Sequence, residues 1–304
     1  MISTLAGVAS ATAFPPASLV APAMPPIPAA TPAAGSTRVN PVPPLATGEI
    51  PASLSLAATP EPRRPGKYWS EWPLIPPDVS GRMIAVYKQG IALGNNPHAF
   101  STIGDCQSAP AIFMGVYDTD RYELGDYQYL EETIHQFEGS FGRQSITVQD
   151  GQSVASVLSP AWADPDLCDS GETPIDCEIR LHKPSILFIN LGTNWQGGND
   201  VTHTEYLKKI VDIALEHGVV PILSSKGDNL EGDYRLNRAT AQVAYEYELP
   251  FWNFWRAIRN LPGKGLDGSK PGQYLSVDAW GRRSFTGLQA LDAVWRSLSP
   301  YSGQ

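Results

Sequence analysis

The sequence predicts an α/β protein with a flavodoxin-like, doubly wound, parallel five-stranded sheet. Short apolar runs alternate with segments of helical periodicity, which is the pattern of strands joined by right-handed helical crossovers. The run at 185–191 (SILFINL) is almost continuously apolar, as is typical of a central parallel strand buried on both faces. The five expected strands are 100–104, 144–148, 185–191, 219–224 and 250–254, the last of which has the weakest pattern.

Short polar segments follow the first four of these strands. The first strand ends in Asp105 to Ser108, the second in Gln149-Asp150-Gly151, the third in Gly192 to Trp195, and the fourth in Lys226 to Asn229. Because ligands bind outside the carboxyl ends of the strands in such sheets, we expect the functional site among these segments.

Three segments have the periodicity of helices. The first carries Leu207, Ile210 and Ala214 on one face and is followed by Gly218, a common residue just past a helix end. The second is rich in alanine, and the third closes the chain. The three expected helices are 204–217, 234–247 and 288–298.

The N-terminal part differs in composition from the rest. Residues 1–66 hold half of the 28 prolines, and no charged residue precedes Arg38. Such a segment cannot bury enough apolar surface to offset its ordering entropy, so we expect a disordered stalk or linker over 1–66 and one domain over 67–304. Ala11-Thr12-Ala13 has the small-x-small form of a signal-peptidase site without a basic region before it, which leaves a signal remnant and an ordinary disordered N-terminus as alternatives.

Charge and hydropathy exclude two classes of partner. The net charge of −9 argues against nucleic acid, which is bound through a basic face that neutralises phosphates. The chain as given contains no run of 18 apolar residues, so no membrane-spanning helix is expected.

The three cysteines point to an oxidising compartment. Cys168 and Cys177 are nine residues apart in a stretch rich in Asp, Pro and Gly, a separation that a disulfide can close. Metal ligation by this pair is less favoured, because no CxxC spacing or histidine pair completes a site, and no metal is expected. With the Pro-rich segment before the domain, the pair favours a secreted or cell-surface location and leaves Cys106 as a free thiol.

Three of the segments at the strand ends follow one another along the chain in the same order as the motifs of a family of known enzymes. They are Gly104-Asp105-Cys106-Gln107-Ser108, Gly151 and Gly192-Thr193-Asn194-Trp195. In this order they resemble the motif blocks of SGNH/GDSL hydrolases, which are extracellular or periplasmic esterases, lipases and carbohydrate deacetylases on a flavodoxin-like sheet. The resemblance extends over 99–298. It implies that Cys106 replaces the serine nucleophile, and that Cys106, Gly151 and Asn194 supply the donors of an oxyanion hole.

The last block departs from the family pattern. Where family members commonly have a histidine before Leu-Ser, this chain has Tyr274, and no histidine follows His217. Asp267 is the counterpart of the triad aspartate, at a longer spacing. Among the histidines, His203 alone falls at the carboxyl edge, where a base role competes with a helix-start or surface role. We also expect the pKa of Cys106 to fall at the start of a following helix.

Further side chains at this edge are candidates for substrate contact. They are Gln107, Trp195, Lys226 and Tyr274, while Trp252 and Trp255 are candidates either for stacking on sugar rings or for burial against the sheet. The resemblance implies hydrolysis of ester or O-acetyl groups, of a small-molecule ester or an acetylated carbohydrate, without a cofactor. The alternative, favoured by the missing histidine, is a non-catalytic domain of the same fold that binds glycan or supports a surface structure.

Overall fold

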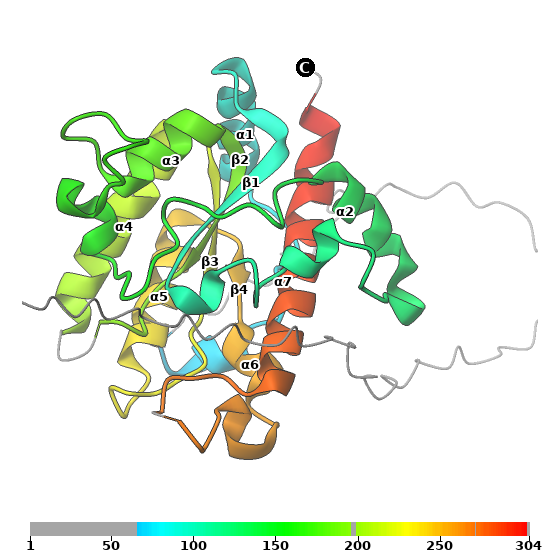
Figure 1. Cartoon of the computed structure of the whole chain (residues 1–304), viewed down its shortest axis with the longest axis vertical. Helices are drawn as coiled ribbons and strands as arrows, with labels where there is room; N and C mark the ends of the chain where they lie inside the picture. The colour runs from blue at the N-terminus through cyan, green and yellow to red at the C-terminus, as the bar shows by residue number, and fades with distance from the viewer. Residues whose placement is uncertain (1–65, 196–198, 271, 303–304) are drawn as a thin grey trace, which may run out of the picture.

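The computed structural model describes residues 66–195, 199–270 and 272–302 (Figure 1). The predicted stalk lies outside these residues except for Gly66. In chain order, the helices and strands are α1 (Gly81–Ala92), β1 (Asn96–Gly104), α2 (Glu131–Gln136), α3 (Pro174–His182), β2 (Pro184–Asn190), α4 (Asp200–Glu216), β3 (Val220–Ser224), α5 (Arg235–Tyr247), β4 (Phe251–Trp252), α6 (Phe254–Ile258) and α7 (Val277–Leu298). Several short 3₁₀ turns join them, among them η1 (Gly66–Glu71), η2 (Cys106–Ser108) and η6 (Pro160–Trp162).

The described sheet is parallel throughout and has the order β1-β2-β3-β4. The predicted α/β class is therefore confirmed, although the sheet has four strands and not five. All seven residues of β2 are buried, as the apolar run predicted. β4 is reduced to two residues, because α6 begins at Phe254.

The expected strand at 144–148 was wrong, and hydroxyl groups explain what replaces it. On the free edge of β1, the backbone N–H of Phe100 donates to Ser140 Oγ (3.4 Å) and that of Thr102 to Ser145 Oγ (3.2 Å). A single parallel bridge then joins Gly104 to Val148. The edge of β1 is thus covered by side chains, which satisfy its donors without a continuous ladder. The segment still lies beside β1, where the second strand of a flavodoxin-like sheet would lie.

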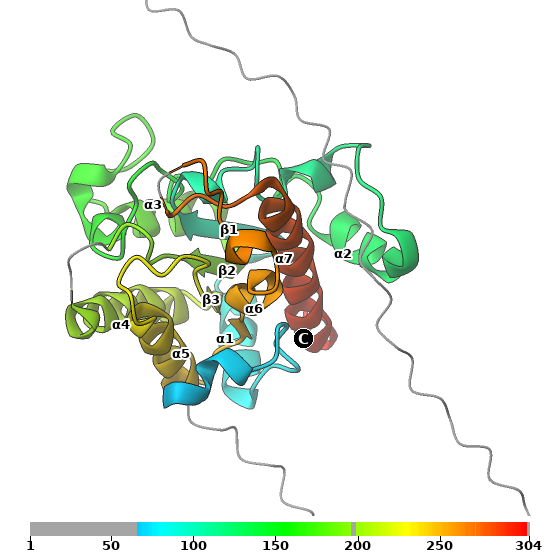
Figure 2. The same ribbon diagram turned by 90° about the horizontal axis from the view of Figure 1, so that it is seen from below.

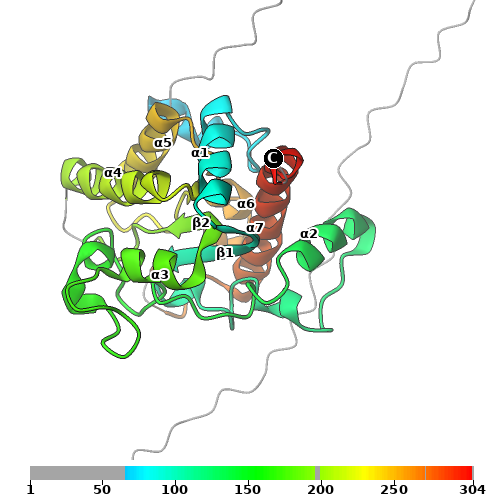
Figure 3. The same ribbon diagram turned by 90° about the horizontal axis from the view of Figure 1, so that it is seen from above.

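Helices cover both faces of the sheet. Figures 1 and 2 show α3, α4 and α5 on one side and α7 on the other, with α2 on the outer side of α7. Figure 3 shows α1 beside β2, and α1 contacts both β2 and β3. None of the helices in the described part of the chain combines the length and apolar character that a bilayer crossing requires.

Two helices begin earlier than predicted because a side chain caps them. The Asn199 side chain accepts a hydrogen bond from the N–H of Thr202 at the start of α4, and Ser276 accepts one from Ala279 at the start of α7. Such caps satisfy a donor that the first helical turn leaves unpaired. As a result, His203 lies in the first turn of α4. The prediction had placed it in a loop.

Candidate functional site

The loop after β1 presents a free thiol at the carboxyl edge of the sheet. Asp105 is buried, and its carboxylate accepts a hydrogen bond from the N–H of Gln107 (3.0 Å), which caps η2. Gly104 has no room for a side chain, because a Cβ there would collide with the Ser108 hydroxyl. Cys106 follows this tight turn, and its free thiol is exposed.

Acidic groups surround the thiol. Partial burial raises the pKa of Cys106 above its ordinary value, and so do the charges of Asp105 and Asp150 and the hydrogen bond from the thiol to the Asp150 carboxylate. The expected fall of this pKa was therefore wrong. η2 has only three residues, too few for a helix dipole to outweigh two carboxylates.

The loop that contains Gly151 lies against the Cys106 loop. Gly151 has a φ of +76°, a conformation that favours glycine. Asn194, in the loop after β2, donates its side-chain amide to Asp105 Oδ2 (3.4 Å) and to the backbone oxygen of Gln152 (3.2 Å). The structure thus brings together the loops of Cys106, Gly151 and Asn194, and the Asn194 amide is used to hold them.

His203 does not present a base to this surface. Its imidazole is buried, and neither ring nitrogen has a hydrogen-bond partner among the described residues. Burial first, and then the charge of Lys226, lower the pKa of His203 to about 4. Trp195 lies over it with a centroid separation of 6.1 Å, and its indole N–H donates to the oxygen of Asn199 (3.0 Å). Both residues therefore build the start of α4.

The loop before α7 uses its polar groups internally. Asp267 accepts hydrogen bonds from the backbone N–H (3.0 Å) and the hydroxyl (2.6 Å) of Ser269, and these bonds lower its pKa. The Tyr274 ring lies 5.8 Å from the Lys270 ammonium. The loop reaches the Cys106 turn through Gln273, whose backbone oxygen accepts from Gln107 Nε2 (3.2 Å).

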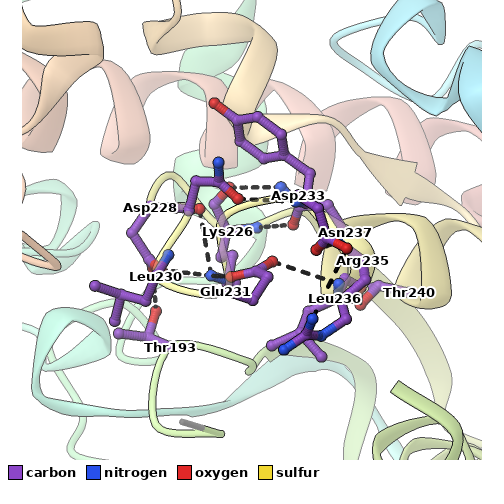
Figure 4. A network of polar contacts seen from close by, with 12 residues as sticks. Thr193, Lys226, Asp228, Leu230, Glu231, Asp233, Arg235, Leu236, Asn237 and Thr240 are labelled. Atoms are coloured by element: carbon purple, nitrogen blue, oxygen red, sulfur yellow. Dashed lines mark hydrogen bonds and ion pairs between the residues drawn. The ribbon is translucent and has the colours of Figure 1, made fainter. Parts of the chain in front are cut away.

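Gln107 and Lys226 face a small polar cavity behind the thiol, not the surface. The cavity has a volume of about 30 Å³, enough for about two water molecules. The side chain of Lys226 is buried and forms ion pairs with Asp228 and with Glu231 (2.6 Å) (Figure 4). The cavity walls include Asp105, Gln107, Asn190, Thr193, Ser224, Lys226, Asp228 and Arg283.

Sequence analysis missed Arg283 of α7, which supports the Cys106 turn from inside. Its guanidinium donates to the backbone oxygen of Gln107 and to Ser108 Oγ (3.0 Å), and it lies 4.6 Å from the ring centroid of Phe113. Complete burial lowers its pKa to about 10, while the charge of Asp105 opposes that change. Arg283 lies on the same face of α7 as Gly287 and Ala290, so a charged residue within an apolar helical stripe was the available signal.

Two further residues at this edge were not predicted. Asp150 was named only as part of the turn that ends the expected second strand. Trp162 lies between the expected second and third strands, where nothing in the local sequence indicates a place beside Gly151. The structure places its ring 3.6 Å from where a Cβ on Gly151 would lie.

The predicted disulfide is confirmed. Cys168 and Cys177 are bonded to each other, and Cys106 is free. Glu172 lies near both sulfurs, but it pairs with Arg180 (2.8 Å). The bridge joins the acidic loop after η6 to α3.

Comparisons with known proteins give structural likenesses at low identity. No protein-family model matches the chain, and no curated protein matches it. The chain is similar in structure to TesA, with 16% sequence identity and a TM-score of 0.42, over 67% of this chain and 99% of TesA. The chain is also similar in structure to a GDSL-like lipase from Bacteroides thetaiotaomicron VPI-5482, with 14% identity and a TM-score of 0.42, over 69% of this chain and 98% of the lipase. At these identities the likeness concerns the course of the chain and says nothing of its activity.

Proposed function

We propose that the chain is an SGNH/GDSL-like hydrolase of ester or O-acetyl groups that uses Cys106 as its nucleophile. The observation that carries the proposal is the position of the exposed thiol at the end of β1, close to the Asp150 carboxylate and flanked by the loops of Gly151 and Asn194. A thiol placed beside a carboxylate and backbone donors has the parts that acyl transfer requires.

Two backbone donors favour the same chemistry. Within the described residues, the N–H groups of Cys106 and Gly151 have no protein acceptor. Unpaired N–H groups beside a nucleophile can stabilise the oxyanion that forms on the carbonyl oxygen, and one such donor is commonly worth about 3 kcal/mol. The Asn194 amide already has two acceptors, so we assign it to positioning the loops.

The reaction would proceed through a thioester. Cys106 Sγ bonds to the carbonyl carbon of the ester while its proton passes to the Asp150 carboxylate. The carbon–oxygen bond to the alcohol then breaks, the alcohol leaves with that proton, and the acyl group remains on sulfur. Water attacks the thioester, Asp150 takes a proton from it and returns one to the departing sulfur, and the carboxylic acid is released. Because a carboxylate is a weak base toward a thiol with a raised pKa, turnover should be slow.

An extracytoplasmic location belongs to the same proposal. The Cys168–Cys177 bridge supports it, since disulfides persist in oxidising compartments. The composition of 1–66 is compatible with a stalk that holds the domain away from a surface.

A second candidate, a non-catalytic binding domain of the same fold, is favoured by one observation. His203 is buried and the pKa of Cys106 is raised, so the site lacks the activated pair that efficient hydrolases use. Such a domain would bind the acyl or acetylated group without cleaving it.

Hydrolysis of p-nitrophenyl acetate and of an acetylated xylo-oligosaccharide by the purified full chain tests the proposal. We expect slow release that is abolished in Cys106→Ala and retained in Asp166→Asn, which changes an exposed carboxylate that is not among those acting on the pKa of Cys106. Hydrolysis that survives Cys106→Ala would reject Cys106 as the nucleophile. Saturable binding of the oligosaccharide with no release would support the binding domain instead.

A further inference from the structure

An exposed tryptophan, Trp162, lies against the loop of Gly151, which forms part of the candidate site. The Trp162 ring approaches Gly151 so closely that its Cη2 atom lies 3.6 Å from where a Cβ would be. Gly151 directly follows Asp150, whose carboxylate lies close enough to the Cys106 thiol to raise its pKa. The indole thus contacts the residue that follows Asp150, the proposed proton acceptor.

Backbone hydrogen bonds anchor the turn that carries this ring. Trp162 is the last residue of η6, its N–H donates to the oxygen of Ser159 (2.9 Å), and Pro160 begins the turn. The backbone oxygen of Trp162 accepts from Gln149 Nε2 (3.1 Å), which ties the turn to the loop of Gly151. These hydrogen bonds fix the backbone of Trp162 relative to the loop of Gly151.

The ring remains open to solvent. Trp162 is 39% exposed, and in the described part of the chain no other aromatic ring stacks on it. The two tryptophans predicted near the last strand differ: Trp252 is buried and donates to Thr286 Oγ1 (3.1 Å), and the ring centroid of Trp255 lies 5.1 Å from that of Trp69. Trp162 is therefore an exposed aromatic side chain that lies against the loop of Gly151.

We infer that Trp162 is a specificity-determining platform on which the ring of a neutral carbohydrate stacks while its acyl group lies at Cys106. An indole offers a large apolar face, which suits the C–H face of a pyranose. The exposed Asp150 carboxylate next to Gly151 accepts hydrogen bonds from sugar hydroxyls and repels an anionic ligand. An aryl ring would use the indole face but would offer the carboxylate no donor.

This inference rests on the proposed function for the identity of the reacting group, but its test does not require turnover. Binding of acetylated xylotetraose and of phenyl acetate is measured by calorimetry and by saturation-transfer NMR in the Cys106→Ala protein. In this background we expect the oligosaccharide to bind, Trp162→Ala to weaken its binding at least tenfold, and Trp162→Phe to restore most of the loss. Tyr129→Ala, which removes an exposed aromatic side chain near α2, should leave binding unchanged.

The other results would overturn the inference. Equal oligosaccharide binding with and without the Trp162 ring would exclude the platform. Loss of phenyl acetate binding alone in Trp162→Ala would assign the platform to aryl esters, and absence of binding to both probes would reject it altogether. Binding that depends on Trp162, together with no hydrolysis of either ester by the wild-type protein, would retain the platform and reject the hydrolase.

Discussion

The side-chain amide of Asn194 donates a hydrogen bond to the buried carboxylate of Asp105 over 3.4 Å. These residues lie at the ends of neighbouring strands, and Asp105 directly precedes the free thiol. A second bond from the same amide reaches the backbone oxygen of Gln152 (3.2 Å). One side chain therefore holds the three loops that form the candidate site.

Replacement of Asn194 should loosen this arrangement. Asn194→Ala removes both hydrogen bonds and should lower the free energy of unfolding by about 1 kcal/mol. Asn194→Asp should cost more at pH 7, because it places a second carboxylate beside Asp105. Urea denaturation of both variants checks this order. Equal stability of the aspartate variant and the wild type would contradict the observed contact.

The raised pKa of Cys106 predicts slow alkylation at neutral pH. Iodoacetamide reacts with the thiolate, so the midpoint of the rate against pH should lie above about 8.5, the value of an ordinary thiol. Asp150→Asn removes a negative charge, and the rate at pH 8 should rise severalfold. Asp166→Asn is the control and should leave the rate unchanged. A midpoint below pH 7 would instead indicate an activated thiol.

The buried His203 should make the protein sensitive to acid. Its pKa is about 4 when folded, against about 6.5 for an unperturbed histidine. Because the folded state favours the neutral ring, this stabilisation is complete above pH 6.5 and is lost as the pH falls through 4, up to about 3 kcal/mol. His203→Phe should therefore gain stability relative to the wild type between pH 7 and pH 4.

Chemical denaturation at several pH values measures the effect. His135, which is exposed on α2, provides the control, since His135→Phe should show no comparable gain at low pH. A stability difference between His203→Phe and the wild type that does not change with pH would contradict the depressed pKa.

Arg283 should be important for the turn that carries the thiol. Arg283→Met leaves the acceptors at Gln107 and Ser108 without their buried donor, and should destabilise the protein by about 2–3 kcal/mol. It also removes the charge that holds down the pKa of Asp105. Arg282→Met, at the next position of α7, should cost on the order of 1 kcal/mol or less. Thermal unfolding of the two variants compares them directly.

The sequence could predict the parts of the fold that depend on apolar burial. The run at 185–191 predicted β2 because a strand buried on both faces has few polar residues. The same pattern wrongly predicted a strand at 144–148. There the Ser145 hydroxyl accepts a hydrogen bond from the edge of β1 in place of a backbone carbonyl. Such a contact depends on a strand more than 40 residues away, which local patterns do not record.

Of the candidate site, only the loops that form it could be predicted from the sequence. Polar segments after strands indicated Cys106, Gly151 and Asn194, because parallel strands bring their carboxyl ends to one edge. The environment of the thiol could not be predicted, since the conformation of the loops places the Asp150 carboxylate near the thiol and the Trp162 ring against Gly151. His203 was misplaced because the Asn199 cap extends α4 toward its N-terminus.

Trapping the acyl intermediate tests the central claim most directly. The full chain is incubated with p-nitrophenyl acetate, quenched in acid within seconds, digested, and analysed by mass spectrometry beside Cys106→Ala and Asp150→Asn. The proposed reaction predicts an acetyl group on the peptide that contains Cys106, sensitive to hydroxylamine and absent in Cys106→Ala. In Asp150→Asn this acetyl group should persist longer, because the carboxylate that takes a proton from the attacking water is missing. Turnover of the ester without any acetylation of Cys106 would contradict the account.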